Sequence, residues 1–300
     1  MKAKTFQMIS STSAFLSLPL LLGGFLLGLA ATTGQAAPIT PGDLVIYRVG
    51  DGTAALGTTA TSVFLDEYNI SGLLMQSIAV PTTGVGAMTA TGNSSTEGII
   101  SRSQDGTSLI FTGYRKNAGG TSPAADTYLV TSRVIGTLTT AGTPNTTTTV
   151  INDNGVTTAN SIRSATSLDG TSAFWVSTSA RVSYDGAGLG SAAGTTQIDA
   201  RNSRQVNLSG NTLFAANGST AITGKVQTYG TLPTGATAPT PVVTLALTDA
   251  VNGFVLLDMD AGVAGDDTLY ALSTVENLLR KYSFNGATWS ASVQSLPAAQ

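Results

Sequence analysis

The sequence predicts an all-β fold, and within that class a β-propeller of four-stranded blades. Short apolar runs, rich in Val, Ile, Leu, Phe, Tyr and Thr, are separated by Gly, Asn, Asp and Pro, which is the pattern of strands and hairpins. No long stretch after Pro41 has the apolar periodicity of a helix. A third observation is a repeat, a tight turn followed by an apolar strand, that recurs along the chain.

The expected strands follow these runs in order. They are Leu44–Val49, Ser62–Leu65, Leu73–Val80, Leu109–Tyr114, Tyr128–Ile135, Ala173–Ser177, Thr212–Ala216, Val242–Leu247, Phe254–Leu257, Leu269–Leu272 and Leu279–Phe284. Stretches rich in Gly, Pro, Thr and Ser are expected to form loops. These are Asn117–Asp126, Ala141–Thr149, Tyr184–Thr195 and Tyr229–Pro241.

The repeat is clearest in four segments, which begin at Ser103, Ser167, Asn207 and Ala264. Each reads as the end of a strand, a tight turn such as Asp-Gly, and an apolar strand, and Gly supplies the positive φ of such turns. A weaker fifth copy begins at Gly42, and intervals of 40 to 64 residues separate the copies. Propeller blades repeat at about 40–50 residues, and loop insertions account for longer intervals. A β-sandwich and a right-handed β-helix are the alternatives; no short coil-length period supports the β-helix.

The first 36 residues are predicted to be a secretory signal peptide. Lys2 and Lys4 precede an apolar run from Phe15 to Ala31, and Gly34-Gln35-Ala36 fits the small-x-small pattern of a cleavage site after Ala36. An uncleaved membrane anchor is the alternative, although Pro19 and a Gly pair interrupt the run, which is close to the lower limit for a membrane span. Residues 37–300 are then one propeller-like domain of about five blade-like repeats, without a membrane span.

Composition removes several classes of chemistry. The chain has no His and no Cys, which excludes Ser-His-Asp catalysis, thiolate nucleophiles, disulfides and iron–sulfur clusters. Export without a disulfide indicates a bacterial envelope protein. A net charge of −3 argues against a nucleic-acid partner, since phosphate binding needs clustered Lys and Arg.

The densest acidic cluster contains Asp258, Asp260 and Asp266, followed by Asp267. Asp258 and Asp260 would point to the same side of a strand and could offer oxygen ligands to Ca²⁺. The spacing lacks the Asp-x-Asp-x-Asp-Gly loop and its bidentate Glu, so hydrogen bonding within a turn is the favoured interpretation. Calcium is the one cofactor that the sequence suggests.

Three arginines precede aligned turns. Arg102, Arg163 and Arg204 lie three to six residues before Asp105, Asp169 and Ser209. Equivalent positions in successive blades could place them at the propeller axis, where they would bind an anionic ligand. The competing interpretation is that isolated arginines cover apolar surface.

Carboxylates offer a further candidate site. Asp66 or Glu67 could form half of a pair for glycoside chemistry, with Glu97 as a candidate partner. Adjacent strand residues point to opposite faces, so only one of Asp66 and Glu67 could line a site. A solvated or strand-capping role is the favoured interpretation.

Two stretches resemble a group of secreted bacterial propeller-like proteins. The first is Val63-Phe64-Leu65-Asp66-Glu67-Tyr68 with Gln76 to Thr82 and Ser95 to Gly98; the second runs from Leu257 to Tyr270 and from Leu279 to Trp289. With loop differences, the similarity extends across essentially the whole chain after residue 36. Members are uncharacterised, and some end in a cell-surface sorting tail. The resemblance implies the fold and an extracellular location, and implies no catalytic residue.

The chain differs from that group at its end, because Gln300 follows soon after a strand-like segment from Trp289 to Val293. A propeller leaves open edges unless its first and last blades are joined, so the last blade is expected to be truncated. The expected function is non-catalytic binding or scaffolding, outside the cell or at its surface, with a glycan or protein partner, as a monomer or surface-anchored. A carboxylate-based glycosidase or lyase and a structural adhesin or matrix protein are the alternatives.

Overall fold

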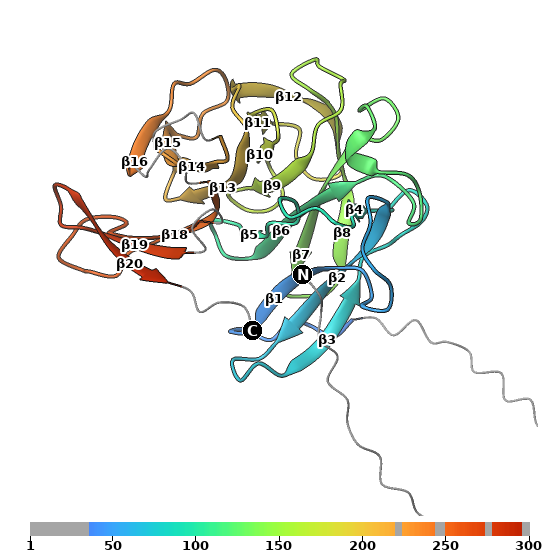
Figure 1. Cartoon of the computed structure of the whole chain (residues 1–300), viewed down its shortest axis with the longest axis horizontal. Helices are drawn as coiled ribbons and strands as arrows, with labels where there is room; N and C mark the ends of the chain where they lie inside the picture. The colour runs from blue at the N-terminus through green and yellow to red at the C-terminus, as the bar shows by residue number, and fades with distance from the viewer. Residues whose placement is uncertain (1–35, 220–223, 244–249, 274–277, 296–300) are drawn as a thin grey trace, which may run out of the picture. The chain divides into compact units, whose positions relative to one another are not determined.

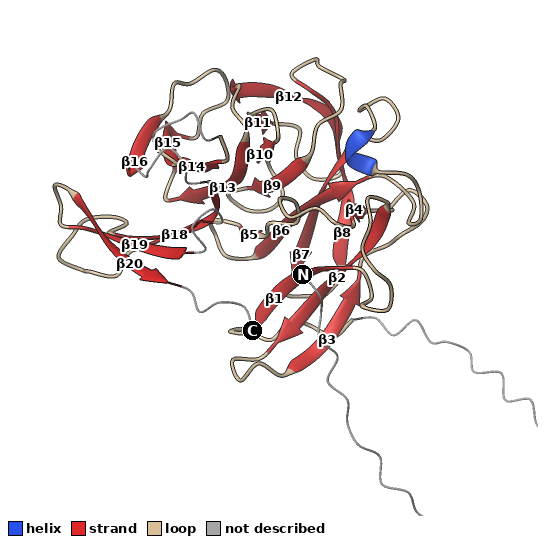
Figure 2. Cartoon of the chain, viewed as in Figure 1, coloured by secondary structure: helices blue, strands red, loops and turns tan. Residues whose placement is uncertain are grey.

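The computed structural model describes residues 36–219, 224–243, 250–273 and 278–295 (Figure 1). These residues are built from strands and connecting loops, with one 3₁₀ turn at Pro123–Ala125 within the described part (Figure 2). The strands are β1 (Leu44–Val49), β2 (Ala60–Tyr68), β3 (Leu74–Ala79), β4 (Thr89–Thr91), β5 (Ser101–Arg102), β6 (Ser108–Tyr114), β7 (Arg133–Thr139), β8 (Pro144–Asp153), β9 (Ile162–Thr166), β10 (Phe174–Thr178), β11 (Val182–Asp185), β12 (Ala192–Asp199), β13 (Ser203–Ser209), β14 (Thr212–Asn217), β15 (Val226–Thr231), β16 (Thr240–Val243), β17 (Val251–Leu257), β18 (Thr268–Ser273), β19 (Leu278–Phe284) and β20 (Trp289–Ser295).

Four consecutive antiparallel strands form the repeating unit, which is the arrangement of a propeller blade. The runs β5–β8, β9–β12, β13–β16 and β17–β20 each pair in sequence order. We call these runs meanders. The predicted class, an all-β fold with four-stranded blades of the β-propeller type, is therefore confirmed.

Tight turns join the first two strands of three meanders, as the repeat predicted. Gly106, Gly170 and Gly210 have φ values of +75°, +72° and +53°, a region that only glycine adopts readily. Asp105 and Asp169 accept hydrogen bonds from the backbone N–H groups of Thr107 and Thr171, which closes each turn with a side chain. The fourth segment, from Ala264, lies at the end of a longer connection between β17 and β18.

The apolar core consists of layers between successive meanders. Because strand side chains alternate between faces, Phe174 and Val176 of β10 face the β5–β8 meander, whereas Trp175 faces the β13–β16 meander. A further layer joins the last two meanders, where Val226 packs with Phe254. Burying both faces in this way explains why β9 and β10 are buried along their whole length.

The first three strands differ from the meanders. β1 pairs with β2, and β2 pairs with β3, so the described part of this sheet has three strands in sequence. Its inner face packs on the β5–β8 meander, where Val63 and Leu65 join Phe111 and Val134 in one cluster. The short strand β4 connects β2 to β6.

A parallel pairing joins two meanders directly. β12 pairs with β8 through Ala192–Thr149 and Ala193–Val150, and the register shifts at the next residue. Together with β4, this pairing links twelve described strands into one sheet, whereas β13–β16 and β17–β20 form separate sheets. Outer strands of neighbouring blades are thus hydrogen-bonded here, a feature that the sequence repeat did not predict.

Candidate functional site

A polar pocket lies among the first strands of three meanders. It has a volume of about 590 Å³ and is lined by residues of β5 and its turn, by β13, and by Phe254 and Val255 of β17. Polar lining residues outnumber apolar ones. The polar residues are Ser101, Arg102, Ser103, Gln104, Asp105, Gln205, Asn207 and Ser209. We call this the axial pocket, because successive first strands contact one another here. Amides and hydroxyls of this kind suit a polar, hydroxyl-bearing ligand.

Hydrogen bonds fix some of these groups and leave others available. Gln205 accepts a 2.7 Å hydrogen bond from the backbone N–H of Phe254, so its amide connects two meanders. Asp105 accepts from the hydroxyl of Ser103 at 2.6 Å, and this hydrogen bond is the main cause that lowers the pKa of Asp105. A carboxylate held ionised in this way is poorly suited to act as a general acid.

Arg102 is exposed, and its Nε and Nη2 donate to the carbonyl oxygen of Gly106 at 3.1 and 3.0 Å. Its side chain is therefore folded against its own turn. It also borders a second pocket of about 320 Å³, which Val45, Leu109 and Leu138 line.

Arg163 and Arg204 lie close enough for their charges to repel. Both are on first strands, β9 and β13, at the end away from the Gly170 and Gly210 turns. Arg163 is 6% exposed, and its pKa is lowered to about 10, first by burial and then by the charge of Arg204. Its Nη1 donates to Asn202 and to the carbonyl of Ser203. The Nε atoms of both arginines are buried without a hydrogen-bond partner in the described part of the chain.

The predicted arginine register is thus partly visible in the structure. Arg102, Arg163 and Arg204 all belong to first strands. Arg163 and Arg204 are brought together, whereas Arg102 lines the axial pocket beside the turn. Anion binding by these residues stays a prediction.

The acidic connection between β17 and β18 is organised by Asp267, the most buried of its aspartates. Asp267 accepts from the backbone N–H groups of Met259 and Asp260, and from the Thr268 hydroxyl. Asp258 and Asp260 are exposed and Asp266 is half-buried. Within the described ranges, no group of three or more His, Cys, Asp or Glu side chains is placed to hold a metal ion. The hydrogen bonds of Asp267 are those expected if the aspartates of this connection stabilise a turn.

Asp66, Glu67 and Glu97 occupy separate environments. Asp66 forms an ion pair with Arg48 at 2.5 Å. Glu97 accepts a 2.8 Å hydrogen bond from Tyr114, and burial raises its pKa despite this bond. Glu67 accepts from the backbone of Thr40 and from Gln76.

Sequence reasoning missed the residue that faces Glu67, which is Asp43. Partial desolvation and then the charge of Glu67 raise the pKa of Asp43. Asp43 also lines the 320 Å³ pocket. The sequence did contain a signal that could have identified Asp43 as a candidate, because it lies directly before β1 in the Gly42–Asp43 copy of the repeat.

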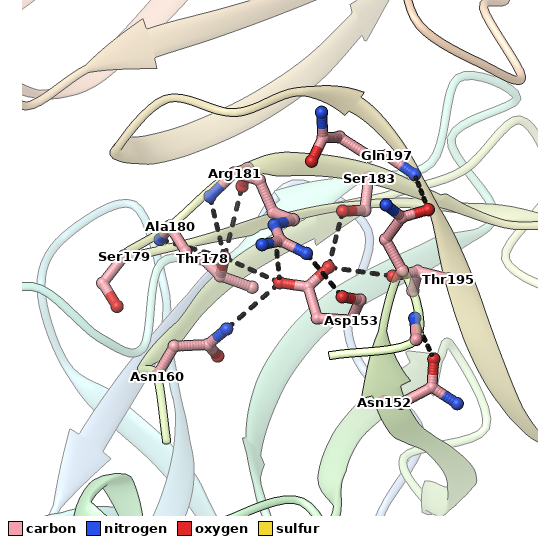
Figure 3. Close-up of polar contacts among 12 residues, drawn as sticks. Asn152, Asp153, Asn160, Thr178, Ser179, Ala180, Arg181, Ser183, Thr195 and Gln197 are labelled. Carbon is pink, nitrogen blue, oxygen red and sulfur yellow. Dashed lines mark hydrogen bonds and ion pairs between the residues drawn. The ribbon is translucent and has the colours of Figure 1, made fainter. Parts of the chain in front are cut away.

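The most extensively bonded carboxylate is Asp153, at the end of β8 (Figure 3). It is 1% exposed. Its oxygens accept hydrogen bonds from Ser183, Thr195, Asn160 and Thr178. Arg181 adds an ion pair at 3.6 Å and also donates to the backbone carbonyl of Asp153. These donors come from β10, β11, β12 and neighbouring loops, so Asp153 joins β8 to the next meander (Figure 3).

The predicted leader falls outside the described residues except for Ala36. Ala37, which would begin the mature chain, exchanges two hydrogen bonds with Gln76: its N–H donates at 3.1 Å and its carbonyl accepts at 2.9 Å. In the part of the chain that the structure describes, no helix is long and apolar enough to cross a membrane.

No protein-family model matches the sequence, and comparison with curated proteins finds no match. Solved structures give distant likenesses. The β-propeller domain of Swd1 from Myceliophthora thermophila is 8% identical, with a TM-score of 0.40, and the alignment covers 87% of this chain and 89% of that one. A chain of Bacteroides fragilis, provisionally assigned as a 6-phosphogluconolactonase, is 10% identical with a TM-score of 0.49, covering 86% and 69%. A chain of the mitotic checkpoint complex is 12% identical with a TM-score of 0.41, covering 93% and 88%.

Proposed function

We propose that this chain is an exported bacterial protein that binds an extracellular glycan or protein without catalysing a reaction. The observation that carries the proposal is the axial pocket, whose polar lining residues are mostly amides and hydroxyls. Such groups exchange hydrogen bonds with sugar hydroxyls or peptide groups. Asp105 is the carboxylate of that lining, and its lowered pKa keeps it ionised. A pocket with this chemistry suits recognition better than acid–base catalysis.

Asn207 is the side chain best placed to test the pocket. It lines the pocket from β13, and no hydrogen bond of its amide is present within the described residues. An available amide at the wall of a pocket is a ready contact for a ligand hydroxyl. Asn211 serves as its matched control, because it is an exposed residue of the same type in the adjacent turn.

Glycan-array binding of the exported chain, with and without Ca²⁺, tests the proposal. We expect binding to a restricted set of polar or acidic glycans, at least tenfold weaker for Asn207→Ala and unchanged for Asn211→Ala. Binding that needs Ca²⁺ would support the metal prediction at Asp258, Asp260 and Asp266. Equal binding by both variants would remove the axial pocket from the proposal.

Export rests on the sequence of residues 1–36, so it needs its own experiment. Expression of the full chain in a Gram-negative and a Gram-positive host, followed by N-terminal sequencing of the exported product, would locate the cleavage. We expect the mature chain to start at Ala37. Retention of the intact chain in the cytoplasm would contradict the proposed location.

A carboxylate-based glycosidase or lyase is the second candidate, and one observation favours it. Asp43 and Glu67 interact directly, and their neighbourhood raises the pKa of Asp43. However, Asp43 lines the adjacent pocket whereas Glu67 is buried beneath Thr40 and Gln76. A glycosidase needs two carboxylates that reach the substrate. Release of reducing sugar by the wild type, lost in Asp43→Asn, would establish this candidate instead.

A further inference from the structure

The first sheet differs from the four meanders in its strand pairing, and the difference lies at the edge of β1. In every meander the second strand is paired on both sides: β6, β10, β14 and β18 each contact a first strand and a third strand. Among the described strands, β1 pairs with β2 alone.

Two independent observations identify β1 as a second strand. In the sequence, Gly42-Asp43 followed by an apolar run aligns with the turn-and-strand repeat that produces β6, β10 and β14. In the structure, β1 packs on β6, the second strand of the next meander: the rings of Tyr47 and Phe111 are 6.4 Å apart, and Tyr47 donates to the carbonyl of Thr112. The open position beside β1 therefore corresponds to the first-strand position, which β5, β9, β13 and β17 occupy in the four meanders.

The backbone of β1 presents hydrogen-bonding groups to that place. Gly50 donates to Ser62 across the β1–β2 register, and antiparallel strands bond to one neighbour at every second residue. The even-numbered residues of β1 thus bond to β2. The N–H and C=O groups of Val45, Tyr47 and Val49 point the other way. An edge of this kind accepts an added strand.

The surroundings specify the chemistry of the added strand. The 320 Å³ pocket beside Val45 is walled by Leu109 and Leu138, so it has room for an apolar side chain. At the start of β1, the half-buried Asp43 lines this pocket and has no salt bridge within the described residues. The buried Glu67 lies close enough for its charge to act on Asp43. Two adjacent negative charges attract a cation.

We propose that the edge of β1 binds an extended segment of a partner protein, which adds a strand antiparallel to β1 with an apolar residue in the 320 Å³ pocket and a Lys or Arg against Asp43. The antiparallel direction places that basic residue toward the C-terminal end of the segment. β5 shows the same arrangement, with Arg102 as its last residue, next to the turn. This interaction is separate from the axial pocket, so it goes beyond the proposed function and stands or fails independently.

A peptide taken from the chain itself is a suitable probe. Residues 98–104, with the sequence GIISRSQ, include β5, which already occupies a first-strand position, and carry Arg102 near the C-terminal end. A labelled synthetic peptide of this sequence is titrated with the purified exported protein by fluorescence anisotropy. The control peptide has Glu in place of the arginine.

Two protein variants probe the edge. Val45→Pro removes one outward N–H at an edge, where proline is tolerated, and we expect at least tenfold weaker binding with a melting temperature close to that of the wild type. Asp43→Lys should weaken binding by a similar factor and should bind the Glu control peptide better than the original. Leu73→Ser, an exposed apolar site outside β1, should bind like the wild type.

Three results would overturn the proposal. These are no binding of the probe by the wild type, equal binding by Val45→Pro, and equal binding of both peptides by Asp43→Lys. Sedimentation provides a further check: a wild-type dimer that Val45→Pro converts to monomer would mean that a second copy, not a partner, occupies the edge. Glycan-array binding by Val45→Pro should be unchanged, which separates failure here from failure of the axial pocket.

Discussion

The Asp153 cluster and the Arg163–Arg204 pair are two buried charged regions on neighbouring strands, and their hydrogen bonding differs. Both oxygens of Asp153 accept hydrogen bonds, and Arg181 forms an ion pair with it. The Nε of Arg181 also lacks a hydrogen-bond partner in the described residues, but it lies 3.6 Å from the opposite charge of Asp153. Arg163 and Arg204 have like charges, and each has a buried Nε without a partner in the described part of the chain. Buried charges are retained at low cost only when they are paired and hydrogen-bonded. Opposite charges therefore hold strands together in the first region, whereas like charges oppose folding in the second, where anion binding stays a prediction.

Asp153→Ala should give the largest effect. It removes the acceptor for Arg181, Ser183 and Thr195 together, and breaking a buried pair by removing one partner costs about 3–5 kcal/mol. Urea unfolding followed by tryptophan fluorescence measures the loss. Asp258→Ala, at an exposed site whose carboxylate has no hydrogen bond or ion pair within the described residues, should change stability by less than about 0.5 kcal/mol. A loss below about 1 kcal/mol for Asp153→Ala would mean that the cluster is not a structural connection.

Arg204→Met should act in the opposite direction. Replacing an unpaired, partly buried charge with an apolar side chain of similar length removes its repulsion of Arg163, and we expect a gain of about 1 kcal/mol. Thermal unfolding in the absence and presence of sulfate measures both effects. If the pair binds anions, sulfate should raise the melting temperature of the wild type more than that of the variant. A net destabilisation by the substitution would show that Arg204 has a stabilising contact.

The hydrogen bonding of Asp185 is intermediate between that of Asp153 and that of the Arg163–Arg204 pair. It is fully buried on β11; one oxygen accepts from Ala187, and the other has no partner within the described residues. Burial raises its pKa, so ionisation is penalised in the folded state. The cost is absent below the pKa of the unfolded chain and develops as pH rises through the folded pKa.

Asp185→Asn should therefore stabilise the protein by about 1 kcal/mol at pH 7, and this advantage should disappear as pH falls toward 4. Unfolding free energies of the wild type and the variant across this range measure the difference. An advantage that is independent of pH would point to a change in packing, and ionisation would then not be its cause.

Gly218→Ala should give the smallest effect. A Cβ at this position would lie 2.5 Å from Nε of Arg204, so the guanidinium must move. We expect a loss of about 0.5–1 kcal/mol in the wild type and a smaller loss in the Arg204→Met background. A double-mutant cycle measures this coupling, and additive effects would mean that the two side chains do not interact.

Local signals allowed the fold class and the turns to be predicted. Asp-Gly turns depend on a glycine φ and on a side chain two residues away, both of which are readable in sequence. The Thr-rich segment Ala141–Thr149 was expected to be a loop, but most of it belongs to β8. Its hydroxyls find partners in other segments: Thr146 donates to Gly86, and Thr148 accepts from Gly190. A buried strand whose hydroxyl groups are hydrogen-bonded to other segments has the same polar composition as a loop, so the sequence alone does not distinguish the two.

The sites were less predictable because their contacts connect distant residues. The repeat located three arginines on first strands, but it could not indicate that Arg163 and Arg204 repel each other. Asp153 bonds to residues up to 42 positions away, and no local pattern indicates such a cluster. Tyr128 was assigned to a strand on its apolar character. It lies in a loop before β7, where its ring contacts the guanidinium of Arg133 at 4.1 Å.

The parallel pairing of β8 with β12 has a consequence for how the molecule opens. Repeats that contact each other only through side chains can unfold one at a time. The backbone bonds across β8 and β12 join two repeats into a single cooperative unit. The sheets β13–β16 and β17–β20 have no such strand pairing to a neighbouring meander within the described strands, although one backbone hydrogen bond joins Thr237, between β15 and β16, to Ile198 of β12. Native-state hydrogen exchange should therefore report the amides of β5–β12 opening together, with those of the last two sheets exchanging through smaller, separate openings.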